Sequence, residues 1–161
     1  MEERDDVIIE HPNREKASSK AAKATVLLLL LVSVGLMLIV TVGGWDVLQG
    51  AKPVTIAYIL VYLIMAFYVA QWNRGVLPVA AALAILLAIF AAVAVPGWVD
   101  RDSSGFEQPA IDAGVLAIVT ALIIPVQILL IAFALRAFNQ AWNVEVERTT
   151  PSHSGSAPAA A

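Results

Sequence analysis

The chain has 161 residues, of which 60% are apolar and 14% are charged, and its formal net charge is −3. A soluble domain carries about 25% charged residues, and here the charges are also confined to a few stretches, so the composition excludes an ordinary soluble domain. There is no cysteine, which excludes disulfides, iron–sulfur clusters, thiolate zinc sites and thiol redox chemistry.

Residues 1–23 form a predicted polar tail, for which we expect disorder up to Pro12 and a helical preference over residues 13–23. The tail is too long and too acidic for the start of a cleaved signal peptide, so we predict that the apolar run after it is retained. Lys16, Lys20 and Lys23 share one helical face. They either contact anionic lipid or only set the orientation of the chain, and we favour the second interpretation.

Four apolar runs follow, each long enough to cross a bilayer core of about 30 Å as a helix. Because backbone N–H and C=O groups must be paired inside hydrocarbon, runs of this length predict helices. We therefore predict an all-α integral membrane protein that forms a four-helix transmembrane bundle. The predicted spans are residues 24–43, 54–72, 76–96 and 112–138, joined by an outer loop at 44–53, a cytoplasmic turn at 73–75 and an outer acidic loop at 97–111.

The uncharged cores of these spans contain few polar side chains. Tyr58 and Tyr62 share a face of the second span. Thr120 and Gln127 share a face of the fourth, where Pro125 predicts a kink. These side chains predict either a polar pocket or path, or hydrogen bonds that hold the helices together, and we favour the hydrogen bonds.

Alanines recur at four-residue spacing in the third and fourth spans. Small side chains let helix backbones approach closely, so these ridges predict helix packing. Two ridges exceed what one tight helix pair requires, and we expect one of them to receive a partner helix. The predicted packing residues are Ala84, Ala88 and Ala92 in the third span, and Ala117 and Ala121 in the fourth.

Lys and Arg are distributed unequally between the two sides of the predicted bundle. Eight of the ten lie in the tails, the middle turn or the inner end of the fourth span, and the other two are Lys52 and Arg101. Positive charge collects on the cytoplasmic side of membrane proteins, so we predict that both termini are cytoplasmic.

Tryptophans lie at the ends of the predicted spans, as is typical of anchors at the membrane interface. The segments around them are similar in pairs, which indicates either a duplicated helical hairpin or the general preference of boundaries for such residues. We favour the general preference. The predicted anchors are Trp45, Trp72, Trp98 and Trp142.

Asp100, Asp102 and Ser104 match the opening of a calcium-binding loop, D-x-D-x-S-G. The twelfth position of that loop requires a bidentate Glu and is Ile111 here. We therefore interpret the match as a chance one and predict no metal site, with these three residues as the weak candidate ligands.

Residues 139–161 form a predicted disordered cytoplasmic tail, because the segment from Thr149 is of low complexity. Both histidines lie in the tails and the spans contain no catalytic set, so we predict no cofactor and no enzyme. We also expect no nucleic-acid partner.

The sequence predicts a small non-enzymatic accessory or scaffold subunit in a plasma membrane of the bacterial inner type, bound to another membrane protein or to itself. The alternative is a homo-oligomeric carrier or channel for a small molecule or ion, with an uncharged polar path along Gln127, Thr120 and Tyr62.

Overall fold

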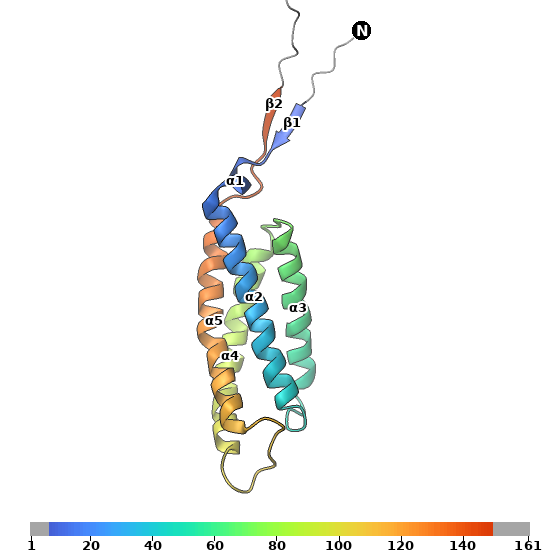
Figure 1. Ribbon diagram of the computed structural model, residues 1–161, viewed down its shortest axis with the longest axis vertical. Helices are drawn as coiled ribbons and strands as arrows, with labels where there is room; N and C mark the ends of the chain where they lie inside the picture. The colour runs from blue at the N-terminus through green and yellow to red at the C-terminus, as the bar shows by residue number, and fades with distance from the viewer. Residues whose placement is uncertain (1–6, 150–161) are drawn as a thin grey trace, which may run out of the picture.

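The computed structural model describes residues 7–149, most of which lie in four long helices (Figure 1). All four helices are long and apolar enough to cross a membrane, as the sequence predicted. They form two hairpins, which pack side by side. The elements are β1 (Val7–Glu10), α1 (Pro12–Glu15), α2 (Ala17–Gly43), α3 (Lys52–Ala70), α4 (Val76–Arg101), α5 (Ala113–Asn139) and β2 (Val146–Thr149).

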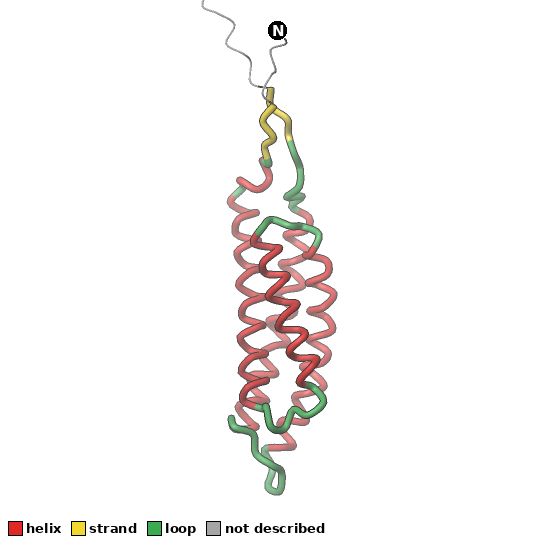
Figure 2. The backbone as a smooth tube through the Cα atoms, turned by 90° about the vertical axis from the view of Figure 1, so that its right-hand side faces the viewer, coloured by secondary structure: helices red, strands yellow, loops and turns green. Residues whose placement is uncertain are grey.

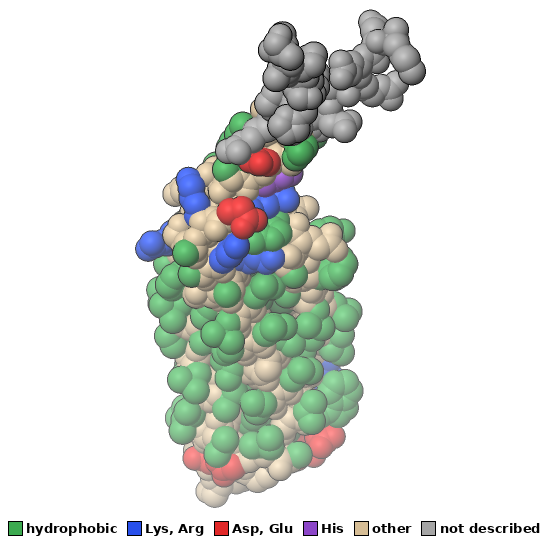
Figure 3. All heavy atoms as spheres, turned by 45° about the horizontal axis from the view of Figure 1, so that its top comes forward, with side chains coloured by type: hydrophobic (Ala, Val, Ile, Leu, Met, Phe, Trp, Pro, Cys, Tyr) green, Lys and Arg blue, Asp and Glu red, His purple; other side chains and the backbone are tan. Residues whose placement is uncertain are grey.

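The two ends of the bundle differ in chemistry. We call the end that carries α1, β1, β2 and the turn at residues 71–75 the tail end, and the opposite end, with residues 44–51 and 102–112, the loop end (Figure 2). Lys and Arg side chains gather at the tail end, and hydrophobic side chains cover the belt between the ends (Figure 3).

Two helix bounds differ markedly from the predicted ones. α2 begins at Ala17 rather than at residue 24, in keeping with the helical preference of residues 13–23. α4 continues through Pro96 to Arg101, so the segment expected as an outer loop at 97–111 is helical over its first five residues. Proline removes one hydrogen-bond donor, and this loss is tolerated one turn before the helix ends. The other bounds lie within two residues of expectation.

The tails are ordered where they meet the bundle, which differs from the disorder expected for residues up to Pro12 and from 139 onward. β1 pairs antiparallel with β2, from Val7 opposite Thr149 to Glu10 opposite Val146. The two strands form a ribbon that projects from the tail end (Figure 1). The low-complexity segment at 150–161 lies outside the described residues.

α1 connects this ribbon to the end of α5. Asn13 Nδ2 donates to the carbonyl of Ala141 at 3.0 Å, and Arg14 Nε donates to the carbonyl of Trp142 at 3.1 Å. The last carbonyls of a helix and those just beyond it need partners from outside the helix. The N-terminal tail supplies such partners, so it is fixed against the end of the last helix.

Buried side chains follow each helix in alternating steps of three and four residues. On α5 this seam includes Leu116, Thr120, Ile123, Gln127 and Leu130. The average step of 3.5 residues is that of helices packed at shallow angles in bundles. The core therefore follows one face of each helix, and on α3 it begins only at Ile59.

The alanine ridges follow this seam over only part of their length. α4 packs most extensively on α5, with Ala84 and Ala117 buried, Ala88 and Ala121 half-buried and Ala92 exposed. A four-residue step turns by about 40° on a helix of 3.6 residues per turn, so the ridge leaves the seam after two or three steps. The buried parts of both ridges pack inside the bundle, and a partner helix on the exposed part of a ridge stays a prediction.

Candidate functional site

The deepest polar side chains form a hydrogen-bonded cluster that joins three helices. Tyr62 of α3 donates from its hydroxyl to Gln127 Oε1 of α5 at 2.9 Å. Gln127 Nε2 donates to Ser33 Oγ of α2 at 2.8 Å, and Ser33 Oγ donates to the carbonyl of Leu29 at 2.7 Å. Tyr62, Gln127 and Ser33 are fully buried. Because a buried polar group without a partner is costly, loss of Gln127 would leave the Tyr62 hydroxyl without its acceptor.

Thr120 and Tyr58 lie outside this cluster, although the sequence grouped them with Gln127 and Tyr62. Thr120 Oγ donates to the carbonyl of Leu116 on its own helix at 2.7 Å, as hydroxyls in helices often do. The Tyr58 ring meets the rings of Tyr62 and Phe90 edge to face, with centroids 5.9 and 6.1 Å apart. The predicted polar face is thus divided into a closed cluster and two residues that border a cavity.

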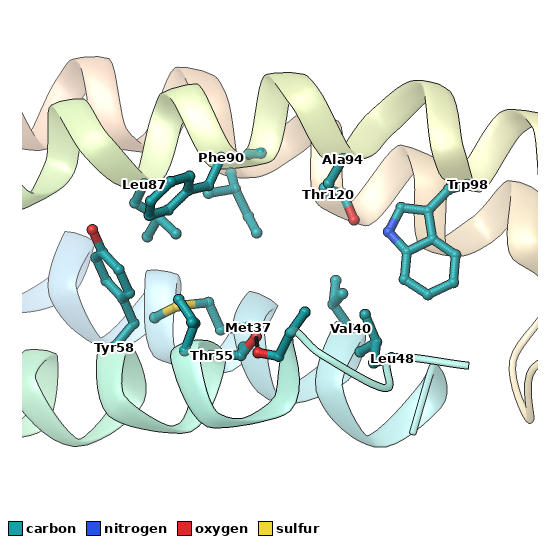
Figure 4. A pocket seen from close by; sticks show the side chains of 14 residues that line it. Met37, Val40, Leu48, Thr55, Tyr58, Leu87, Phe90, Ala94, Trp98 and Thr120 are labelled. Carbon is teal, nitrogen blue, oxygen red and sulfur yellow. Dashed lines mark hydrogen bonds between the residues drawn. The ribbon is translucent and has the colours of Figure 1, made fainter. Parts of the chain in front are cut away.

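The cavity has a volume of about 330 Å³ and lies among all four helices in the half of the bundle near the loop end (Figure 4). α3 and α4 contact each other sparsely, and the cavity opens between them, where Val54 and Phe90 are about half exposed. Its wall is mostly hydrocarbon. The lining residues are Met37, Val40, Leu48, Ala51, Val54, Thr55, Tyr58, Leu87, Phe90, Ala91, Ala94, Trp98, Thr120 and Ile123.

Trp98 closes the cavity at the loop end. A Cβ on Gly44 would stand 2.5 Å from the Trp98 ring, so the glycine leaves room for the indole against the turn after α2. The Trp98 side chain is 5% exposed, and its N–H faces the cavity (Figure 4). It has no hydrogen-bond acceptor within residues 7–149 but remains accessible from the cavity, since Arg74 Nε is the one fully buried side-chain donor without a partner there. The cavity therefore offers one unused donor in an apolar wall.

A polar recess of about 390 Å³ adjoins the cavity at the loop end and shares Leu48 and Ala51 with it. Arg101 and Glu107 supply its charged groups. Arg101 Nη1 donates to the Glu107 carbonyl at 3.5 Å and lies over the Phe106 ring. In the described part of the chain it has no carboxylate within 4.0 Å. An apolar cavity thus leads into a recess with a cation at its edge.

The acidic loop does not have the geometry of a calcium loop. Asp100 lies in the last turn of α4, Asp102 follows that helix, and Ser104 lies in the next turn. Residues two apart on a helix point about 200° apart, so Asp100 and Asp102 do not converge. Asp102 Oδ2 lies near the start of α5, 3.2 Å from the position of a Cβ on Gly114. Within residues 7–149 no three His, Asp or Glu side chains are placed to hold a metal ion.

The tryptophans lie at the two ends of the bundle, but three of them pack within the protein. Trp45 is exposed and has the Lys52 ammonium 4.6 Å from its ring centroid. Trp142 is fully buried and meets the half-buried Trp72 edge to face at 5.2 Å. Together with the burial of Trp98, these contacts show that three of the four predicted anchors pack against other residues at the helix ends, and their place at a membrane interface stays a prediction.

The three lysines of the predicted basic face have different surroundings. Lys16 is exposed at the start of α2, and Lys20 forms an ion pair with Glu15 at 3.0 Å. The ammonium of Lys23 lies 4.1 Å from the centroid of the Trp72 ring. Two of the three therefore have partners within the protein.

Comparison of the chain with protein-family models, with curated proteins and with solved structures found no match. The sequence did not predict the hydrogen bond between Gln127 and Ser33, nor the cavity and its neighbouring recess. One sequence pattern indicates where the cavity and the recess lie on α4. Residues that line them recur at alternating steps of four and three and so share one helix face. These residues are Leu87, Ala91, Ala94, Trp98 and Arg101.

Proposed function

We propose that the chain is a small multi-pass membrane protein that serves as a non-enzymatic accessory or scaffold subunit of a membrane complex. The cluster of Ser33, Tyr62 and Gln127 carries this proposal. A carrier or channel would present its few uncharged polar groups to a solute, whereas each of these side chains is bonded within the bundle. Interhelical hydrogen bonds of this kind stabilise a membrane bundle and leave its outer surface to interact with other proteins.

We place both termini on the cytoplasmic side of a plasma membrane of the bacterial inner type. The pairing of β1 with β2 supports an even number of crossings between them, which four spans supply. The Lys and Arg side chains at the tail end support the cytoplasmic assignment, because positive charge is retained on that side.

α3 is the helix that we propose for contact with a partner. Of the four spans within residues 7–149, it has the smallest share of its apolar segment buried inside the bundle. Its outer face presents large side chains, including Leu60, Ile64 and Phe67. Helices associate in lipid through close packing rather than through a hydrophobic driving force, so we expect a complementary helix surface on the partner.

Crosslinking in the native membrane and reconstitution of the pure protein together test this function. A photoreactive residue at Ile64 should crosslink to a second protein of discrete mass, and the same residue at Ser104 in the loop should not. Liposomes that contain the pure protein should show no solute flux above that of empty liposomes. Crosslinks that join only copies of this chain, or specific flux by the pure protein, would contradict the proposal.

A homo-oligomeric carrier is the second candidate, and the cavity between α3 and α4 is the observation that favours it. Tyr58 and Thr120 border this cavity, while Gln127 and Tyr62 lie outside it, so a path along all four residues would require the cluster to open. Flux that is abolished by Gln127→Leu would support the carrier over the accessory subunit.

A further inference from the structure

We propose that the apolar cavity and the polar recess together bind one glycerophospholipid. One acyl chain of the lipid lies between α3 and α4, and its phosphate lies at Arg101. This inference does not depend on the accessory role, since a bound lipid is compatible with either candidate function.

The cavity has the size and the wall that a hydrocarbon chain requires. Its volume of about 330 Å³ falls at the lower end of the range for ligand pockets, roughly 300–1,000 Å³. From Leu87 to Trp98 the α4 face runs eleven residues, which is about 16 Å at 1.5 Å per residue. A single extended acyl chain has a similarly long and narrow shape.

A second transmembrane helix is a poor match for the same space. A helix with its side chains is about 10–12 Å across, whereas the cavity lies inside the bundle among all four helices. A partner helix could therefore cover the opening but would not enter the bundle. A lipid chain enters from the bilayer through the gap between α3 and α4 without any opening of the bundle.

The unused N–H of Trp98 indicates where the polar end of the chain lies. This donor is at the loop end of the cavity, on a side chain that is 5% exposed. The ester carbonyl of a glycerolipid is a hydrogen-bond acceptor at the boundary between the acyl chain and the head group. Binding of that carbonyl would supply the partner that the indole lacks within residues 7–149.

Arg101 lies one helical turn beyond Trp98, at about 4.5 Å along the axis, where the phosphate would follow the ester. Its guanidinium can form two parallel hydrogen bonds to phosphate oxygens. Lys52, next to the recess residue Ala51, is a second cation without an ion pair in the described part of the chain. Glu107 also lines the recess, so a zwitterionic head with an ammonium group suits it better than an anionic head.

Native mass spectrometry of the full-length protein in mild detergent tests the site. The delipidated protein is mixed with phosphatidylethanolamine, with phosphatidylglycerol, or with diacylglycerol that has the same two chains. We expect one bound phosphatidylethanolamine per chain, with phosphatidylglycerol bound more weakly and diacylglycerol bound weakest. Equal binding of all three lipids, or no stoichiometric binding, would overturn the proposal.

Three substitutions separate the parts of the site. Ala94→Trp at the opening of the cavity should abolish binding, whereas Ala92→Trp on the exposed face should not. Trp98→Phe keeps an aromatic ring, although a smaller one, removes the donor and should weaken binding. Arg101→Gln should weaken phosphatidylethanolamine binding roughly tenfold, as expected for the loss of a charge-assisted hydrogen bond, and leave diacylglycerol binding unchanged.

The melting temperature of each variant without lipid shows whether it still folds. Trp98→Phe and Arg101→Gln keep the test decisive if Ala94→Trp fails to fold. Unchanged phosphatidylethanolamine binding in both would place the lipid elsewhere and overturn the inference. A photoreactive residue at Ala94 that crosslinks to protein rather than to lipid in the native membrane would overturn it as well.

Discussion

Gln127 has one partner on each of two neighbouring helices, and this arrangement determines the effect of replacing it. Its amide accepts from Tyr62 and donates to Ser33. Ser33 keeps its own bond to the Leu29 carbonyl, but Tyr62 would lose its acceptor. The phenol would then be a buried hydroxyl without a partner, which is the costly part of the change.

We therefore expect Gln127→Met to lower the melting temperature in detergent, with a loss close to that of an interhelical hydrogen bond, about 0.6 kcal/mol and at most roughly 1.7. A double-mutant cycle with Tyr62→Phe should show that the two losses are coupled. Thr120→Val is the control, because the Thr120 hydroxyl bonds only within its own helix. Additive effects of the two cluster substitutions would contradict the described geometry.

The sequence predicts some of these residue-level features and not others. Gln127 stands out as an amide deep in a span, and bonding between helices was the favoured interpretation. Its partner Ser33 could not be predicted, because residues 33 and 127 come together only through the way in which the two hairpins dock. The same limit applies to Trp98, whose burial depends on Gly44 in another hairpin.

The elements show how the period of a helix controls which small residues are buried. α4 carries Ala84 and Ala92 eight residues apart, and the first is fully buried while the second is exposed. Both were predicted packing residues, because two residues that are four apart lie on nearly the same face of a helix. Over several helical turns the buried seam advances by three and four residues alternately, so Ala84 and Ala91 lie in the seam and are buried, whereas Ala92 lies outside it.

This pair gives a matched test on one helix. Ala84→Leu adds bulk where α4 packs most closely, and we expect a loss of about 1–3 kcal/mol in stability from overpacking. Ala92→Leu adds the same bulk to an exposed position and should change stability by less than about 0.5 kcal/mol. Thermal unfolding in one detergent compares them. An equal loss in both variants would mean that the seam of α4 is not the one described.

At the scale of the whole molecule, the four long apolar helices follow directly from the long uncharged runs, and the sequence predicted all of them. The arrangement of their ends is harder to predict. The ribbon of β1 and β2 joins segments from the two ends of the chain, and neither four-residue strand has a pattern that indicates pairing. The cavity is equally hidden, because it results from the sparse contact between α3 and α4.

The absence of natural cysteine makes the orientation simple to measure. Ser104→Cys in the loop should react with a membrane-impermeant maleimide in intact cells. Ser18→Cys at the tail end should react only after the membrane is permeabilised, because we place it in the cytoplasm. Both positions are exposed, and the unmodified chain is the unreactive control. The reverse pattern of labelling would show that the protein is inserted the other way.

The ribbon also implies an order of events during synthesis. β1 leaves the ribosome first, and its partner at Val146–Thr149 is made only after every helix, at about 5–20 residues per second. Until then β1 is an unpaired edge with Ile8 and Ile9 exposed, a state that invites pairing with other chains. Release of a chain that stops anywhere before residue 146 leaves this edge open, so the ribbon forms only in a chain that contains both strands.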